Sequence, residues 1–348
     1  MKFIHIADVH WGAQPEKDRS FGRIRENEIK LTFQKVIDYA NKQQTDVLLI
    51  AGDFFDQRPT KQELREVDYI LSGLQNTKTV MIAGNHDHLS TEEEFVKYHW
   101  NSEVYLLDGR ERNYVYFEEL HTTIYGISYW TNQIREAVYD DMKPQDFDEF
   151  SILLAHGGDE SHIPINKDIL KWSGFDYIAL GHIHKPQAMG REMVRYAGSI
   201  LKYSFSEIHM DKKATILTID AKKEISLSFH PLKPLRDMRE IECSLEELLK
   251  KQCEIGKQED YMHVILTDEE QILDAIGKVR TIYPNVMQIS FKNRRHMKQL
   301  ESAQIKEDQI SDQSPAELFE QFYKMQNHID LDEKRLQLVL SVFEEVIR

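Results

Sequence analysis

The sequence is poor in cysteine, in long apolar runs and in basic residues, and each shortage excludes a class of protein. Its 348 residues include only two cysteines, Cys243 and Cys253, which form no CxxC pair and cannot build a disulfide framework. No apolar run approaches the roughly 18 residues of a membrane span. Basic residues are also scarce, because 44 Lys and Arg stand against 59 Asp and Glu and leave a formal net charge of −15. These absences predict a cytoplasmic protein with no membrane segment. They also predict that the protein does not coat nucleic acid through bulk charge.

The distribution of apolar residues predicts two folded domains and a C-terminal tail. Through the first two thirds of the chain, short apolar strands alternate with amphipathic helical stretches, which is the pattern of a layered α/β domain. The pattern then restarts as strand, helix, strand, helix, strand, where Ser244 with Glu247 and Thr267 with Glu270 have capping-box spacing. A polar stretch and two helical segments follow. We therefore expect an α/β domain over 1–235, a small α+β domain over 236–298, and a linker with a helical segment over 299–348.

The first domain is predicted to contain one long helix and a series of short strands. The helix covers about Glu26 to Gln43, where Ile29, Phe33 and Val36 recur at helical spacing. The candidate strands are Lys2 to Ala7, Asp46 to Ala51, Thr79 to Ala83, Thr122 to Tyr125, Ser151 to Ala155, Tyr177 to Leu180, and Val194 to Ala197.

Polar residues cluster directly after the central strands. In such sheets ligands gather at the carboxyl ends of the strands, so these residues are predicted to meet in space. All of them are oxygen or imidazole donors, which suit Mn²⁺, Fe²⁺ or Zn²⁺ and lack the thiolates of a structural zinc site. The predicted metal ligands are Asp8, His10, Asp53, Asn85, His156, His182 and His184.

This ligand set is too large for one ion. Two ions about 3.5 to 4 Å apart and bridged by one carboxylate would use the whole set and leave positions for water and substrate oxygens. Asp53 is the candidate bridge. The ions would bring about +4 and Asp8 with Asp53 about −2, so the site would keep about +2 and attract a phosphate. His86 is a natural proton donor to a leaving oxygen, and Asp87 is placed to orient its ring.

Each motif taken singly has an ordinary explanation. An Asp-x-His after a strand is more often a turn cap beside a surface histidine, and Gly-Asp and Gly-Asn pairs are common in turns. Recurrence after successive strands is what favours the metal site. Asp56 is equally compatible with a contact to a metal ligand and with a turn. Histidines without such a pattern are predicted to be structural or exposed, namely His5, His88, His99, His121 and His162.

The motifs resemble those of a known family. The chain is similar to the calcineurin-like metallophosphoesterase superfamily in the series Asp8-Val-His10, Gly52-Asp53-Phe54-Phe55-Asp56, Gly84-Asn85-His86-Asp87, His156 and Gly181-His182-Ile183-His184. It resembles the SbcD-type DNA repair nucleases more narrowly in His10-Trp11-Gly12, in the continuation Lys185-Pro186-Gln187, and in Tyr196-Ala197-Gly198-Ser199.

This resemblance implies a four-layered α/β nuclease domain that holds two Mn²⁺ ions, followed by a capping domain that helps to seat DNA. Family members cut DNA ends exonucleolytically, open hairpins or single strands endonucleolytically, and work with a coiled-coil ABC-type ATPase of the SbcC kind. A homodimer is compatible with this resemblance. Carried onto this sequence, the catalytic histidine would be His86. One ion would be held by Asp8, His10, Asp53 and His184, and the other by Asp53, Asn85, His156 and His182.

Two other functions stay open on the sequence. One is a phosphatase of the same superfamily acting on phosphoproteins or small nucleotides, although Gln57-Arg58 and Asp87 stand where serine/threonine phosphatases carry Arg-Gly and Glu. The other is a non-catalytic scaffold with a vestigial site, which the complete ligand set disfavours.

Two basic segments and the C-terminal tail are candidates for binding partners. The stretch from Lys292 to Lys298 and the loop from Gln14 to Asn27, which carries Arg25, could grip DNA phosphates or be solvated surface. Apolar stripes in the last two predicted helices suggest docking of a partner.

Overall fold

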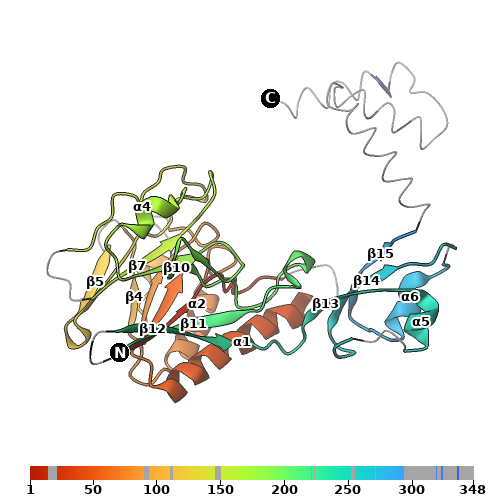
Figure 1. The fold of residues 1–348 in the computed structure, drawn as a ribbon, viewed down its shortest axis with the longest axis horizontal. Helices are drawn as coiled ribbons and strands as arrows, with labels where there is room; N and C mark the ends of the chain where they lie inside the picture. Colours follow the sequence, from red (N-terminus) through yellow and green to blue (C-terminus); the bar gives the residue numbers. More distant parts are fainter. Residues whose placement is uncertain are drawn as a thin grey trace. The chain divides into compact units, whose positions relative to one another are not determined.

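Two units make up the part of the chain that this computed structural model describes (Figure 1). The larger contains residues 1–240 and 256–261, and the smaller contains 241–255 and the described residues from 262 onward. The described residues are 1–14, 22–89, 94–109, 113–145, 150–220, 222, 224–251, 255–270, 272–293, Phe319, Tyr323, Arg335 and Leu336. Most of the predicted C-terminal helices and of the basic stretch 292–298 therefore lie outside the described residues.

Two six-stranded sheets form the centre of the larger unit. The first has the order β12-β11-β1-β2-β3-β4, with strands β1 (Lys2–Ile6), β2 (Val47–Ala51), β3 (Lys78–Ile82), β4 (Val104–Leu106), β11 (Lys213–Ile219) and β12 (Ile225–Pro231). The second has the order β5-β6-β7-β8-β10-β9, with strands β5 (Tyr114–Phe117), β6 (Thr122–Gly126), β7 (Phe150–His156), β8 (Tyr177–Gly181), β9 (Gln187–Met189) and β10 (Arg191–Tyr196).

The central strands of each sheet run parallel, so their carboxyl ends meet at one edge. In the first sheet β1 pairs with β2 and β2 with β3, and in the second β6 pairs with β7 and β7 with β8, all in parallel register. Parallel sheets are found almost only where both faces are covered, which explains why these strands are nearly continuous apolar runs.

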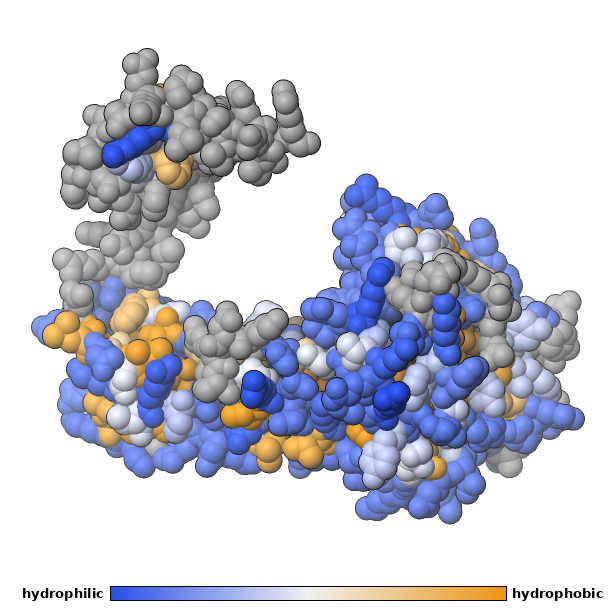
Figure 2. Space-filling view, turned by 180° about the vertical axis from the view of Figure 1, so that it is seen from behind, coloured by the Kyte–Doolittle hydropathy of each residue, from blue (hydrophilic) through white to orange (hydrophobic). Residues whose placement is uncertain are grey.

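Apolar side chains on the two faces of each strand build the layers. Along β2, Val47 and Leu49 belong to the core between the sheets, while Leu48 packs with the residues of the helices. Helices α1 (Gly22–Gln43), α2 (Lys61–Leu71) and α3 (Glu94–Lys97) contribute to that outer core, and α4 (Lys167–Lys171) contributes to a third core on the second sheet. The predicted four-layered α/β architecture is confirmed. Figure 2 shows mainly hydrophilic side chains over the visible face of the larger unit.

The helix and strands predicted for the larger unit are present, with differences at their ends. Helix α1 begins at Gly22 rather than near Glu26, and its N-terminal half carries the buried Arg25. Strands β4, β5 and β9 and the hairpin β11–β12 were not predicted. Along β12 exposed and half-buried residues largely alternate, which is the signal of an edge strand with one covered face.

The smaller unit has the predicted order of elements. Strands β13 (Met238–Cys243), β14 (Tyr261–Leu266) and β15 (Val286–Phe291) form a three-stranded sheet, with α5 (Leu245–Leu249) and α6 (Ala275–Arg280) between them in sequence. Ser244 and Glu247 form the predicted capping box of α5. The prediction of a capping box at Thr267 and Glu270 is wrong, because α6 begins only at Ala275 and is capped by Asp274. Among the described residues, no helix is both long and apolar enough to cross a bilayer.

Candidate metal centre

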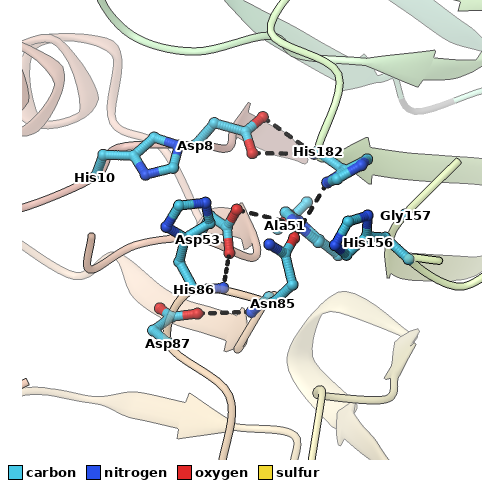
Figure 3. A network of polar contacts seen from close by, with 12 residues as sticks. Asp8, His10, Ala51, Asp53, Asn85, His86, Asp87, His156, Gly157 and His182 are labelled. Atoms are coloured by element: carbon cyan, nitrogen blue, oxygen red, sulfur yellow. Dashed lines mark hydrogen bonds and ion pairs between the residues drawn. The ribbon is translucent and has the colours of Figure 1, made fainter. Parts of the chain in front are cut away.

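The candidate site is built where β1 and β2 end. Asp8, His10 and Asp53 have φ values of 52°, 48° and 47°, a left-handed backbone that residues with side chains adopt rarely and mostly at functional sites. The two loops are held together by backbone hydrogen bonds, from the Asp8 N–H to the Gly52 carbonyl and from the His10 N–H to the Asp53 carbonyl, each 3.1 Å long. These turns direct the three side chains into one space (Figure 3).

Glycines allow the buried ligands to approach the backbone. A Cβ on Gly52, whose φ is +85°, would collide with the imidazole of His156. A Cβ on Gly84 would collide with the Asp53 carboxylate and the His156 ring. The Gly-Asp and Gly-Asn pairs of the sequence are therefore required by the close packing of the site and not only by turn geometry.

One group of predicted ligands contains Asp8, His10 and His184, whose donor atoms lie within 4.8 Å of one another. The Nε2 atoms of His10 and His184 are 3.2 Å apart. Two imidazole nitrogens this close need a proton or a cation between them, because their lone pairs would otherwise repel. This arrangement fits a cation.

A second group contains Asp53, His156 and His182, again within 4.8 Å. Nδ1 of His156 is 2.8 Å from the Ala51 carbonyl oxygen, so a proton on Nδ1 leaves the Nε2 lone pair facing the site. That Nε2 lies 3.3 Å from Asp53 Oδ2 and 3.2 Å from Asn85 Oδ1. Burial alone would lower the pKa of His156, but the adjacent Asp53 carboxylate raises it to about 9. The position between His156 Nε2, Asp53 Oδ2 and Asn85 Oδ1 therefore favours a positive charge.

Asp53 connects the donors around His10 with those around His156, because Asp53, His10 and the exposed His86 form a further group whose donor atoms lie within 4.8 Å of one another. Its Oδ1 accepts the backbone N–H of His86 at 2.9 Å, and its Oδ2 faces His156. Burial would raise the pKa of Asp53, but the neighbouring His156 holds it well below its usual range, so the carboxylate is ionised. A buried, ionised carboxylate between two sets of donors is the expected position of a bridging ligand.

His86 and Asp87 occupy different environments. His86 is exposed, and its Nδ1 lies 2.9 Å from the Asp56 carbonyl oxygen. Asp87 is fully buried and accepts the backbone N–H groups of Gly84 at 2.7 Å and Phe55 at 3.1 Å. The prediction that Asp87 orients the His86 ring is therefore wrong, because its oxygens hold the two ligand loops together. Burial, assisted by the charge of Asp53, raises the pKa of Asp87 to about 7.

Carboxylates that the sequence did not single out stand behind the histidines. Glu207 Oε1 is 3.3 Å from His184 Nδ1, and Asp159 Oδ2 is 3.0 Å from His182 Nε2. Asp56, which the sequence left open, lies 3.3 Å from His10 Nδ1. Outer partners of this kind fix the orientation of metal-binding imidazoles. No local signal in the sequence marks Glu207, whereas Asp159 follows His156 by only three positions.

Glu207 is itself fixed by a buried ion pair. Lys212 Nζ lies 2.5 Å from Glu207 Oε2 and also donates to the carbonyl of His184 at 2.8 Å. Burial would raise the pKa of Glu207, but its contacts with His184 and Lys212 lower it to about 2.

A pocket of about 320 Å³ opens over the first ligand group. Its wall includes the Tyr203 ring, whose centroid lies 5.2 Å from that of His10. It is lined by His10, Ala13, Gln14, Asp56, His86, His184 and Tyr203.

Two cations proposed for DNA contact are engaged elsewhere. Arg25 is buried and donates to Glu28 and to the Lys202 carbonyl. In the smaller unit, Lys292 pairs with Glu242 at 2.8 Å.

Comparison with known proteins assigns the family. The model of the family described as calcineurin-like phosphoesterase matches residues 1–186, which is more than half of the chain. The chain belongs to this family. A second model, SbcD_C, described as the type 5 capsule protein repressor C-terminal domain, matches residues 234–327. The resemblance predicted from the motifs is confirmed.

Two curated relatives are similar over almost their whole length. The D-subunit of nuclease SbcCD from Staphylococcus epidermidis is 27% identical, with 93% of this chain and 93% of the relative covered. The protein of the same name from Staphylococcus saprophyticus is 27% identical, with coverage of 90% and 92%. The crystal structure of TT1561 of Thermus thermophilus aligns with a TM-score of 0.38 and 10% identity, covering 66% of this chain and 98% of that one, a likeness too loose to support an assignment.

Proposed function

We propose that this phosphoesterase is a DNA repair nuclease that depends on two divalent ions, with Mn²⁺ as the best chemical fit. It would remove nucleotides from DNA ends, cut single-stranded or hairpin DNA internally, and work with a coiled-coil ATPase partner. The observation that carries the proposal is the position of Asp53 at the carboxyl edge of the parallel strands, where it belongs to one donor group with His156 and His182 and to another with His10 and His86. The whole-length similarity to proteins named as nuclease subunits supports the choice of substrate.

The residues present fit two ions. We assign Asp8, His10, Asp53 and His184 to one ion and Asp53, Asn85, His156 and His182 to the other. The donor groups around His184 and around His156 support this assignment, the group of His10, Asp53 and His86 supports the sharing of Asp53, and Asn85 Oδ1 lies within 3.2 Å of both His156 and His182. Carboxylate, amide and imidazole donors without sulfur suit Mn²⁺. Divalent ions held there would polarise a phosphodiester and lower the pKa of an attacking water.

The chain's own residues would supply the remaining steps. With a proton on His86 Nδ1 donated to the Asp56 carbonyl, the ring turns its Nε2 edge to the pocket, where a second proton can pass to the leaving oxygen. The hydrogen bond from the backbone N–H of His86 to Asp53 holds the main chain of His86 beside the proposed ligands. Tyr203 and Gln14 border the space that a nucleotide would enter.

A substrate comparison tests the proposal. The purified chain should hydrolyse end-labelled duplex DNA and hairpin DNA with Mn²⁺, and should act poorly on a phosphopeptide or a cyclic nucleotide. Preference for the phosphopeptide or the cyclic nucleotide would favour the phosphatase alternative. Failure to bind Mn²⁺ at all would favour the scaffold alternative.

The partner is tested by truncation. The residues after Met297 would dock the ATPase, and a chain that ends at Met297 should stay folded, cut single-stranded DNA with Mn²⁺, and no longer co-purify with the ATPase. If the truncated chain still binds the ATPase, the docking segment lies elsewhere, and if it is insoluble, the segment belongs to the core.

A further inference from the structure

We propose that Asp159, held in place by His162, is a positioning residue that fixes the orientation and tautomer of His182 and thereby the affinity of one ion. The inference rests on the proposed two-ion site. Neither Asp159 nor His162 was among the residues that the motifs of the family single out, and both lie in the loop that follows β7.

The two ring nitrogens of His182 face different groups. Nδ1 lies 3.1 Å from Asn85 Oδ1, inside the ligand set, and Nε2 lies 3.0 Å from Asp159 Oδ2, on its outer side. A neutral imidazole carries one proton, and a carboxylate can only accept a hydrogen bond. The proton therefore belongs on Nε2, which leaves the Nδ1 lone pair directed at the ion position.

Asp159 is preorganised although its side chain is 52% exposed. Its Oδ1 accepts the backbone N–H groups of Ser161 at 2.8 Å and His162 at 3.0 Å. The His162 ring adds a contact from Nδ1 to Asp159 Oδ2 at 2.9 Å. The loop is closed at its base, since the Gly158 N–H donates to the His162 carbonyl at 3.0 Å. These hydrogen bonds hold the Asp159 carboxylate in a fixed position against His182.

Asp159 differs from the groups behind His156 and His184. Nδ1 of His156 faces a main-chain carbonyl, which no substitution can remove, and Glu207 behind His184 is buried against Lys212. Asp159 can be changed without opening a cavity or leaving a buried charge unpaired, so its effect on the ion can be measured in a folded protein.

The same residues could instead hold an ion of their own. The donor atoms of Asp159, His162 and His182 lie within 4.8 Å of one another. However, an ion on His182 Nε2 would take the lone pair there and force the proton onto Nδ1, which faces Asn85 Oδ1 and the ion position. A neutral His182 cannot serve both sites, and the ligand set around Asp53 provides more donors.

The test is calorimetric titration of the full chain with Mn²⁺. Asp159→Ala should weaken one of the two ions by about 10- to 100-fold and leave the other unchanged, as expected for loss of an outer partner. Asp159→Asn keeps an acceptor oxygen and should recover much of the affinity, and His162→Ala should weaken the same ion less. Glu160→Ala, the exposed neighbour, is the matched control and should bind as the unmodified chain.

Activity against Mn²⁺ concentration gives a second readout. Raising Mn²⁺ above the new dissociation constant should restore kcat in Asp159→Ala, which general damage to the fold would not allow. If Asp159→Ala binds both ions like the unmodified chain, or loses a third ion, the positioning role is wrong while the two-ion site stands. If the unmodified chain binds no Mn²⁺, the proposed site falls and this inference falls with it.

Discussion

Replacing Asp53 by Asn should damage the site more than the same change at Asp8. Both side chains are buried, and the substitution preserves their shape. The Asp8 carboxylate accepts the backbone N–H of His182 at 3.0 Å and belongs to one donor group, whereas Asp53 belongs to two. If the new amide kept its oxygen on the His86 N–H, its NH₂ group would face His156, where the carboxylate now presents Oδ2.

The size of the effect follows from the lost charge. A unit charge and a divalent ion about 4 Å apart attract by about 8 kcal/mol at an effective dielectric constant of about 20. Hydration of the free carboxylate and ion offsets much of this attraction. A residual loss of about 3 to 4 kcal/mol for each ion still corresponds to a several-hundred-fold weaker affinity. Asp8→Asn should show a loss of this size for one ion only.

Calorimetric titration with Mn²⁺ measures both variants against the unmodified chain. Asp53→Asn should show no high-affinity ion, and Asp8→Asn should show one. Thermal unfolding without metal controls for folding, and there Asp53→Asn should lose only the ion pair with His156. An intact high-affinity ion in Asp53→Asn would remove Asp53 from the bridging position, and the assignment of ligands to two ions would have to be redrawn.

Further predictions concern the donor, the backbone and the fold. His86→Ala should keep both ions by calorimetry and lower kcat on DNA by about 10² to 10⁴, and loss of either ion would contradict the assigned role. Gly84→Ala should abolish Mn²⁺ binding, since its Cβ would collide with Asp53 and His156, while circular dichroism stays unchanged. Burial would raise the pKa of Asp68, but hydrogen bonds from Ser102 and Asn101 lower it below its ordinary value, so Asp68 stabilises the fold at neutral pH and that contribution is lost as the pH falls through the folded-state pKa. Asp68→Asn should therefore cost about 2 to 4 kcal/mol in urea unfolding at pH 7 and progressively less in acid, and an equal cost at every pH would refute the reasoning.

The clustering of the proposed metal ligands could be predicted because their signal is local. Each follows a buried strand, and parallel strands bring their carboxyl ends together whatever the details of the loops. Asp8 and Asp53 needed nothing more than this rule. The pairing of His86 with Asp87 failed because adjacent residues in a tight turn point in different directions, and Asp87 turns inward to the N–H groups of Gly84 and Phe55.

The residues behind the histidines could not be predicted in the same way. Glu207 reaches His184 across 23 positions that include β9 and β10, and its place depends on a buried lysine shortly after it. The β11–β12 hairpin shows the opposite case. Alternation in Ile225–Pro231 was readable, but a half-exposed edge strand gives a weaker signal than a buried run.

The outer carboxylates change the electrostatics of the site. With two divalent ions bound, the proposed ligands alone would leave the centre at about +2. Asp56, Asp159 and Glu207 would add about −3 and Lys212 about +1, which together would bring it near neutral. Asp159 and Glu207 lie on the outer nitrogens of His182 and His184, whereas Asp56 also lines the pocket, so negative charge borders the pocket as well. A near-neutral centre on a chain of net charge −15 offers little long-range attraction to DNA beyond a Debye length of about 8 Å. The proposed nuclease would therefore act on phosphates delivered to it, and gripping the duplex would fall to the ATPase partner.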